Sequence, residues 1–453
     1  MFLERCSAVS LLVLGFASEI IFCAQGSDTI MDKFPQDFSF GVGSAAFPTE
    51  GAWDTDGKGA SIWDEFAKNS SNIQGGGDAK KSGDGYHKYR DDVQLLKELG
   101  VSHYKLSFSW PRIMPKGTIA DGLNNAGISY YSDLIDLLVA NGISPLVTLY
   151  HWDLPQALQL KGGWSNRTSV TWFRNYADFC FGRFGNKVKM WTTIEDPFSV
   201  AYKGYESGEH APGLRTPGEV YNVGHNLLLA HAEAYRVYRD TYKTAQKGQV
   251  GISLSSDWFV AKSGTVASTL ADIRALTFRL GWFADPIFKG DYPETMKQLV
   301  TSKRISQGIP NQTLPTFSVA EKAMIKGSVD FLGINHFKTQ LVAPNIDTSS
   351  AGPGFYADQN LVLETDTSYP KLEFRPETNP NSDRRLMGFG LRKLLQYVTA
   401  TYNKPVIYVT QNGLDSCGTL EDQNRVDYIR DYTNSVLQGE CAALYGFNEL
   451  MLG

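Results

Sequence analysis

Four groups of polar side chains stand directly after short apolar runs of this chain. They are His151-Trp152-Asp153, Glu195-Asp196-Pro197, Asn335-His336 and Gln411-Asn412-Gly413. Adjacent carboxyl groups suit acid–base or nucleophilic chemistry, and histidine, asparagine and glutamine side chains hold polar ligands by hydrogen bonds. Taken singly, each group is also explained by a structural role. The prediction of one site therefore depends on a fold that brings the four groups together.

The apolar runs are predicted to be parallel β-strands covered on both faces, because they are short and nearly free of charge. Seven such strands are predicted, at 38–45, 104–110, 143–152, 188–195, 250–256, 329–337 and 405–411. Segments with apolar residues three and four positions apart alternate with them and predict helices. The predicted helices are 89–100, 130–142, 169–185, 222–240, 390–403 and 425–438.

This alternation predicts an α/β fold, a (β/α)8 TIM barrel, since seven strand–helix units exceed what most doubly wound sheets carry. We expect the eighth strand to be short or incomplete, because only ALYGFNELMLG follows the last predicted helix. The segment 345–383, rich in Ser, Pro, Asn and Asp, is predicted to be a long loop after the sixth strand. In such a barrel the carboxyl ends of all strands meet on one face, which would gather the four polar groups.

Composition narrows the classes of ligand. The net charge of -5, the pI near 5.9 and the lack of a dense Lys/Arg stripe argue against a nucleic-acid partner. The seven histidines show no ligand spacing, so we expect no metal, and the glycine-rich pieces lack the setting of a phosphate-binding loop, so we expect no cofactor. Nine tryptophans and 12% aromatic residues suit stacking against sugar rings and favour a carbohydrate-binding cleft.

Longer motifs occur in order along the chain, among them FSFGVGSAAFPTEGAWDTDGKGASIWDEF, FSWPRIMPKG, TLYHWDLPQAL, GWFADPIFKGDYP, DFLGINHF and QNGLD. They resemble the family 1 glycoside hydrolases, in particular the β-glucosidases and the animal lactase and klotho branch. The resemblance extends from about Phe34 to the low 440s. It implies a TIM barrel, retaining O-glycosyl hydrolase activity and a β-glycoside or oligosaccharide ligand.

Two glutamates carry the retaining mechanism of that family, which needs carboxyl groups about 5 to 5.5 Å apart. The nucleophile lies in a T-E-N-G segment after strand seven, and the acid/base lies in an N-E-P segment after strand four. Here these positions are Gln411 and Asp196, and Glu195 stands where the family has asparagine. Aspartate is a shorter acid, whereas an amide is a poor nucleophile and cannot supply negative charge to an oxocarbenium-like transition state. The resemblance therefore implies impaired catalysis at this site.

The expected surroundings of Gln411 also depart from the family pattern. Lys105 stands where the family has an arginine that holds the nucleophile, and Phe337 stands where it has a tyrosine. These family side chains are dispensable once the charge at 411 is absent, and an unmatched buried cation would be costly. We therefore interpret the changes at Lys105 and Phe337 as a consequence of the lost charge at position 411, which those positions no longer need to hold.

The sugar-binding positions are partly kept. Pro48 occupies the place of a glutamine that binds glucose hydroxyls in the family, and the tryptophan and glutamate that follow its eighth strand would lie beyond Gly453. The residues that we expect to bind substrate are His151, Trp152, Asn335 and Lys105. A structural histidine at 151 and a solvated carboxylate pair at 195–196 are the alternative interpretations of those positions.

Three functions remain open on these grounds. The first is a β-glucosidase-like pseudoenzyme that keeps a carbohydrate- or partner-binding cleft. The second is a weakly active or atypical β-glycosidase that hydrolyses O-glycosyl bonds of β-glucosides or β-galactosides and in which Glu195 takes a catalytic role. The third is a klotho-like binding module without enzymatic activity, which predicts a protein partner.

The N-terminal segment predicts export from the cell. Residues 1–26 combine a short charged start, an apolar run and small residues at Ala24 and Gly26, as in a secretory signal peptide, with an anchoring helix as the alternative. Residues 27–453 would then form one glycoside-hydrolase-like barrel domain that lacks a membrane span. The sequons at Asn69, Asn166 and Asn311 fit a secreted glycoprotein.

Cysteine usage adds little to this prediction. Three cysteines follow the predicted signal peptide, so they cannot all pair within one chain. A Cys417–Cys441 bridge is left open, and Cys180 is expected to be a buried apolar residue.

Overall fold

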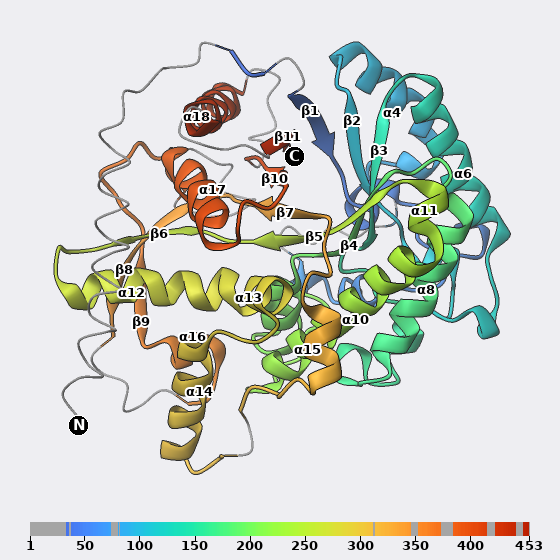
Figure 1. Cartoon of the computed structure of the whole chain (residues 1–453). Coiled ribbons are helices and arrows are strands. Elements are labelled where there is room, and N and C mark those ends of the chain that lie inside the picture. Colours follow the sequence, from blue (N-terminus) through green and yellow to red (C-terminus); the bar gives the residue numbers. More distant parts are fainter. Residues whose placement is uncertain are drawn as a thin grey trace.

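The computed structural model describes residues 33–35, 38–73, 80, 82–310, 313–345, 352–372, 384–414, 422–440 and 447–452 (Figure 1). The predicted signal peptide, Asn311, Cys417 and Cys441 lie outside these residues. Cys180 is buried and free, in agreement with the prediction. Of the other two predicted glycosylation sites, Asn69 is exposed and Asn166 is half-buried.

Eight parallel strands close into a barrel, which confirms the predicted fold class. They follow one another around the barrel in chain order as β1 (Ser39–Gly43), β2 (His103–Ser107), β3 (Ser144–Tyr150), β4 (Met190–Glu195), β5 (Gln249–Ser255), β7 (Phe331–Asn335), β10 (Ile407–Asn412) and β11 (Phe447–Leu452). The short β11 pairs with β10 on one side and with β1 on the other, so the expected short closing strand completes the barrel. The closed ring leaves no exposed sheet edge.

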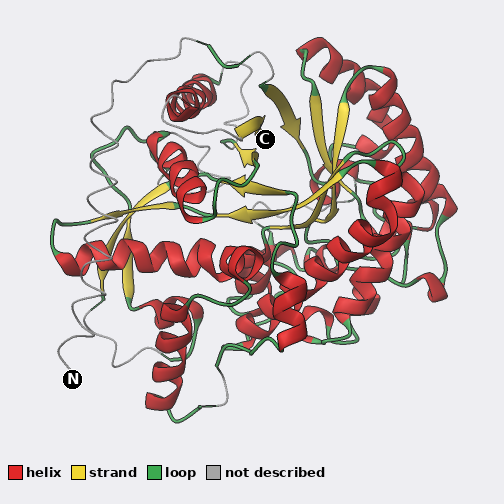
Figure 2. Cartoon of the chain, viewed as in Figure 1, coloured by secondary structure: helices red, strands yellow, loops and turns green. Residues whose placement is uncertain are grey.

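Helices cover the outside of the barrel, as Figure 2 shows. All six predicted helices are present, as α4 (Gly85–Leu99), α6 (Asn125–Ala140), α8 (Ser169–Phe184), α10 (Glu219–Val237), α17 (Phe389–Thr401) and α18 (Gln423–Glu440). α4 ends where Gly100 adopts a left-handed conformation (φ 76°) and its N–H donates to the carbonyls of Leu96 and Lys97. That backbone geometry favours glycine and lets the chain turn into β2.

A second, three-stranded sheet outside the barrel was not predicted. It consists of β6 (Trp258–Ala261), β8 (Thr339–Pro344) and β9 (Leu361–Glu364), in the order β6-β8-β9. α12 (Val266–Leu276) contacts β6 and β8, and Figure 1 shows this unit beside the barrel. The prediction of one long loop over 345–383 was therefore wrong, because this segment contains α16 (Phe355–Gln359) and β9. These elements are too short to show a period.

The remaining helices are inserted between strands or cap their ends. Between β5 and β7 the chain also forms α13 (Trp282–Lys289), α14 (Glu294–Ser306) and α15 (Val319–Ile325). Short helices follow or precede other strands, namely α2 (Ala46–Glu50), α3 (Ile62–Phe66), α5 (Trp110–Ile113), α7 (Gln156–Gln159), α9 (Pro197–Ser199) and α11 (Lys243–Gln246). None of the described helices has the length and apolar character needed to cross a bilayer.

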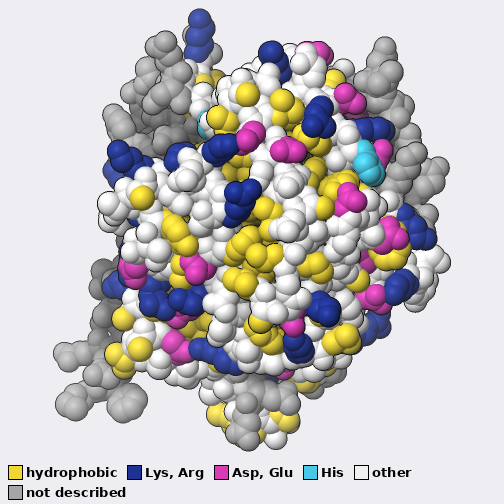
Figure 3. Space-filling model, turned by 90° about the vertical axis from the view of Figure 1, so that its right-hand side faces the viewer, with side chains coloured by type: hydrophobic (Ala, Val, Ile, Leu, Met, Phe, Trp, Pro, Cys, Tyr) yellow, Lys and Arg dark blue, Asp and Glu magenta, His cyan; other side chains and the backbone are white. Residues whose placement is uncertain are grey.

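One continuous apolar core joins the strands to the helices. The stacked rings of Trp110 and Tyr176, 4.5 Å apart, belong to it, as do the fully buried Trp164, Trp191 and Trp282. On the face shown in Figure 3, acidic and basic side chains are interspersed without a large area of one sign. The rigid core thus supports the strand ends where the predicted site residues lie.

Candidate active site

The barrel brings the predicted site residues to one end. His151 follows β3, Glu195 is the last residue of β4, Asn335 is the last residue of β7, and Gln411 lies near the end of β10. Strand register places Asn335 of β7 beside Gln411 of β10 on one side and beside Ser255 of β5 on the other. Because all strands are parallel, their carboxyl ends face the same way, and the predicted gathering of these residues is explained by the fold.

A buried ion pair lies at the centre of this group. Lys105 Nζ lies 2.8 Å from Glu195 Oε2, and both side chains are only 1% exposed. Lys105 Nζ also donates to the carbonyl oxygen of Thr410 at 3.1 Å. The cation at 105 is thus matched by the carboxylate at 195, which the interpretation of Lys105 as a consequence of the lost charge at position 411 did not foresee.

Two further hydrogen bonds extend the pair across the barrel. Asn335 Nδ2 donates to Glu195 Oε1 at 2.7 Å, and Thr410 Oγ1 donates to Asn335 Oδ1 at 2.7 Å. The pairing of β10 with β7 shifts register between Val409 and Gln411, an irregularity of the kind that redirects side chains near functional sites. Lys105, Glu195, Asn335 and Thr410 therefore form one network that links β2, β4, β7 and β10.

This network decides the charge of Glu195. Burial raises the pKa of its carboxyl group, but Lys105, His151 and the hydrogen bond from Asn335 outweigh that effect and hold the pKa below its ordinary value. Burial lowers the pKa of Lys105, and the Glu195 carboxylate opposes this shift. The ion pair at Oε2 and the hydrogen bond at Oε1 both favour the ionised form, so Glu195 is an anion at neutral pH.

His151 is held as a neutral imidazole. Burial lowers its pKa to about 4, against the attraction of Glu195. Its Nδ1 atom is buried and makes no hydrogen bond to any residue that the structure describes. A neutral ring has one donor and one acceptor nitrogen, so His151 is equipped to bind a hydroxyl group.

Trp152 adopts a left-handed backbone conformation with φ 73°. Such a conformation is strained for a bulky residue and is found most often at functional sites. The indole Nε1 donates to the carbonyl of Ala211 at 2.8 Å, and the ring packs edge-on against Trp63 and His210. These contacts hold an aromatic surface beside His151, as stacking on a sugar requires.

Asp196 uses its side chain to cap a helix. Its backbone is left-handed (φ 43°), and its Oδ1 atom accepts a hydrogen bond from the Ser199 N–H at 3.1 Å at the start of α9. Its own N–H donates to the carbonyl of Ser253 at 2.9 Å. The carboxylate is half-buried and already has a structural partner, which weakens its suitability as a proton donor to a ligand.

Gln411 carries an amide that is free of partners within the described part of the chain. Its side chain is half-buried, and the backbone carbonyl oxygen of Gln411 accepts from the backbone N–H of His336 at 3.1 Å. The next residue, Asn412, is tied to the His336 carbonyl at 2.6 Å and to Tyr428 at 3.0 Å. Gln411 can therefore offer a donor and an acceptor to a ligand, but no charge.

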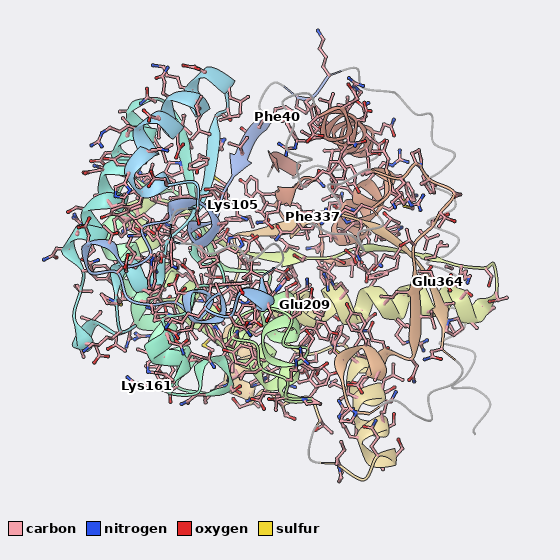
Figure 4. All side chains as sticks on the ribbon, turned by 180° about the vertical axis from the view of Figure 1, so that it is seen from behind. Phe40, Lys105, Lys161, Glu209, Phe337 and Glu364 are labelled. Carbon is pink, nitrogen blue, oxygen red and sulfur yellow. The ribbon has the colours of Figure 1, made fainter. Side chains whose placement is uncertain are left out.

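The two other positions noted in the sequence lie at the edge of this group. Phe337, which follows β7, is half-buried, and the Arg384 guanidinium lies 5.6 Å from its ring centre. Lys105 on β2 and Phe337 come from opposite walls of the barrel, as Figure 4 shows from behind. Pro48 is exposed on α2. Among the described residues, no group of three His, Cys, Asp or Glu side chains gathers as a metal site would require.

Sequence reasoning missed Thr410 and the contact between Lys105 and Glu195. Thr410 precedes the conspicuous amide at 411 and has no special spacing. Lys105 lies in the middle of β2 and Glu195 at the end of β4, and no local pattern pairs these opposite charges. Two ionisable residues in otherwise apolar strands were the one available signal, since buried charges are normally paired.

Comparison with known proteins identifies the group to which this architecture is related. The family model described as glycosyl hydrolase family 1 matches residues 30–442. The human lactase-like protein is 44% identical over 412 residues, which cover 89% of this chain and 71% of that protein. Human lactase/phlorizin hydrolase is 42% identical over 92% of this chain, which spans 21% of the length of that relative.

Solved structures give the same result. An aphid myrosinase superposes with a TM-score of 0.87 at 37% identity, covering 93% of this chain and 89% of the other. A rice Os3BGlu6 β-glucosidase superposes with a TM-score of 0.85 at 38% identity, covering 92% and 89%. At these identities the likeness extends beyond fold to family.

Proposed function

Because this chain belongs to glycosyl hydrolase family 1, we propose that it is a β-glucosidase-like protein that binds a β-glycoside or oligosaccharide but is impaired in hydrolysis. The proposal depends above all on Gln411, the amide at the position where the family resemblance puts the catalytic nucleophile. The retaining mechanism forms a glycosyl ester on a carboxylate. An amide is a poor nucleophile in its place, because it carries no negative charge.

The contacts of the two carboxyl groups at positions 195 and 196 support this proposal. Asp196, at the acid/base position, caps α9 through its side chain. Glu195 is an anion, but Lys105 and Asn335 hold both of its oxygens. A retaining mechanism needs one free nucleophilic carboxylate and one group that releases a proton, and these contacts make Glu195 and Asp196 poorly suited to either role.

Ligand binding is supported by what remains around these groups. Trp152 offers an aromatic surface, and neither Nδ1 of the neutral His151 nor the Gln411 side-chain amide makes a hydrogen bond to a residue that the structure describes. Neutral donors and acceptors beside an aromatic ring suit the hydroxyl groups and apolar face of a sugar. Asn335 and Lys105 are already engaged with Glu195, so we assign them the role of holding the floor of the cleft.

The test is hydrolysis of aryl β-glucosides and aryl β-galactosides by the purified protein. Wild type is compared with the Asp196→Ala variant and with a variant that combines Gln411→Glu and Asp196→Glu. We expect no turnover by wild type above that of Asp196→Ala, but saturable binding of the glycoside by calorimetry. Wild-type turnover above that of Asp196→Ala, or a covalently labelled peptide containing residue 411 after treatment with a fluorosugar, would refute impairment.

A second function, weak hydrolysis that depends on Glu195, is favoured by one observation. Glu195 is an ionised carboxylate at the carboxyl end of β4, next to the position that carries the acid/base in the family. If it acts as a base on water, the Glu195→Gln variant loses all residual turnover while glycoside binding is kept. Equal residual rates in wild type and Glu195→Gln would exclude this second function.

We also propose that the protein is exported and glycosylated. The segment 1–26 has the composition of a signal peptide, and Asn69 is exposed at a sequon. Expression in animal cells should release a protein that begins near residue 27 and shifts in mass after glycosidase treatment. A klotho-like role would add a protein partner. Affinity capture of secreted proteins on the purified wild-type protein, compared with capture on the Gln411→Glu variant, would test this role.

A further inference from the structure

A cavity outside the barrel carries a second inference. Its volume is about 310 Å³, which falls in the range of small-molecule sites. The cavity lies between β2, α2, α4 and α6 and is lined by Tyr104 and Leu106 of β2. Successive side chains of a strand point to opposite faces, so these two residues face away from Lys105, which points into the barrel toward Glu195. The cavity is therefore separate from the candidate active site.

Small residues keep this space open. Ser44 and Ala46 line one side, and Gly83 and Gly85 line another. A Cβ atom on either glycine would lie 3.1 Å from the carbonyl oxygen of Thr49, which is tighter than ordinary contact. The cavity thus results from the shape of the backbone at these positions, where larger side chains are disfavoured.

The walls combine apolar and aromatic surface. Leu96, Leu106 and Leu134 face it from three different elements. Three tyrosines add ring surface, namely Tyr89, Tyr104 and Tyr130. Tyr130 is only 8% exposed, and its hydroxyl has no hydrogen-bond partner among the residues that the structure describes. Such a wall would bury the body of a small ligand and offer it one polar contact.

The charge of the cavity has a single sign. Its lining includes two carboxylates and no Lys, Arg or His side chain. Glu50 is already paired, with Arg112 Nε at 2.8 Å and the Tyr131 hydroxyl at 2.5 Å. Asp92, by contrast, makes no hydrogen bond or ion pair within the described residues. Burial and the neighbouring Asp91 raise the pKa of Asp92 against the effect of Lys88.

We propose that this cavity binds a small organic cation, an amine with an aromatic or alkyl body, with its ammonium group at Asp92. The Asp92 carboxylate is exposed, Lys88 acts on it without forming an ion pair, and no other cation pairs with it among the described residues. Tyrosine rings attract a cation through their π faces. The apolar body would rest among the leucines and tyrosines. This inference is independent of the proposed hydrolytic impairment, since it uses none of the active-site residues.

The test uses phenethylamine as the probe, with 2-phenylethanol and 3-phenylpropionate as neutral and anionic counterparts, all measured by calorimetry on the full chain. We expect saturable binding of the amine, binding at least about tenfold weaker for the alcohol, and no binding of the carboxylate. Asp92→Asn should weaken amine binding about tenfold. Asp91→Asn is the matched control, because Asp91 is the adjacent carboxylate on α4 and does not line the cavity.

Two further variants distinguish binding in the cavity from binding in the candidate active site. The Asp196→Asn variant should bind the amine as wild type does, whereas Leu134→Phe, which fills the cavity, should weaken it. The proposal is overturned if no probe saturates, if the three probes bind equally, or if Asp92→Asn and Asp91→Asn have the same effect. The proposal would also be overturned if Asp196→Asn lost amine binding while Asp92→Asn kept it, because the amine would then bind in the candidate active site.

Discussion

Breaking the Lys105–Glu195 ion pair is the sharpest test of the active-site description. Lys105→Met removes the ammonium group from a carboxylate that is 1% exposed and 2.8 Å away. With an effective dielectric constant of about 20, the Coulomb attraction at that distance is about 6 kcal/mol. Part of it offsets the desolvation of the two ions, so the loss on removing one partner should be about 3–5 kcal/mol.

The size of the loss follows from what remains in the variant. Asn335 would still donate to Glu195 Oε1, but Oε2 would lose its cation. The double variant Lys105→Met with Glu195→Gln carries no buried charge, and we expect it to recover to within about 2 kcal/mol of wild type. The free energy of unfolding is measured in urea at pH 7 for wild type, Lys105→Met, Glu195→Gln and the double variant, and the double-mutant cycle over these four proteins isolates the coupling.

A surface pair provides the matched control. Lys262 lies 2.7 Å from Glu364, with both side chains 40% or more exposed. Lys262→Met should cost less than about 1 kcal/mol, because exposed ion pairs contribute little. If Lys105→Met costs no more than Lys262→Met, or if the double variant is as unstable as the single one, the description of a buried, coupled pair is wrong.

The sign of the pH dependence gives a second readout of the same variants. The pKa of Glu195 lies below its unfolded value, so its stabilising contribution is present above the unfolded pKa and is lost as pH falls through the folded pKa. Without Lys105, burial would raise that pKa instead. The deficit of Lys105→Met relative to wild type should therefore shrink as pH falls from 7 to about 5, and a constant deficit would contradict this reasoning.

Three more outcomes follow from the structure. If Glu195 hinders catalysis, Glu195→Asn added to Gln411→Glu should raise aryl-glucoside turnover above that of Gln411→Glu alone, since Asp196 then no longer has a carboxylate as its neighbour in the chain. Equal rates in the two variants would count against a hindering role of Glu195. Burial lowers the pKa of His336 to about 4, so the folded state resists its protonation, and this residue alone should lower the free energy of unfolding by about 1.5 kcal/mol between pH 6.5 and pH 5. Burial also lowers the pKa values of His151, His225 and His231, which add to the total loss, and His336→Gln should reduce that loss by its own share. Gly100→Ala at φ 76° should cost about 1 kcal/mol, although nothing lies within 4 Å of the new methyl group, while Gly264→Ala, equally open and without a positive φ, should be neutral in the same denaturation assay.

Much of the barrel was predictable because its signals are local. A buried parallel strand is a short apolar run, and an amphipathic helix repeats apolar residues along one face, so β3 and α8 can be recognised without knowledge of their neighbours. The β6-β8-β9 sheet could not be recognised in this way. Its strands are short, and each is defined by a partner elsewhere in the chain, as in the pairing of Leu341 with Glu364.

The chain by itself determined which groups are available at the carboxyl ends of the strands. Gln411 is an amide and Asp196 an acid whatever the fold, and residues after strand ends must meet on one face of a parallel barrel. Only the tertiary structure decided what those groups do with one another. It paired Lys105 with Glu195 and turned Asp196 toward α9, because electrostatic and hydrogen-bond energies depend on distance and burial, which closing the barrel creates between residues remote in sequence.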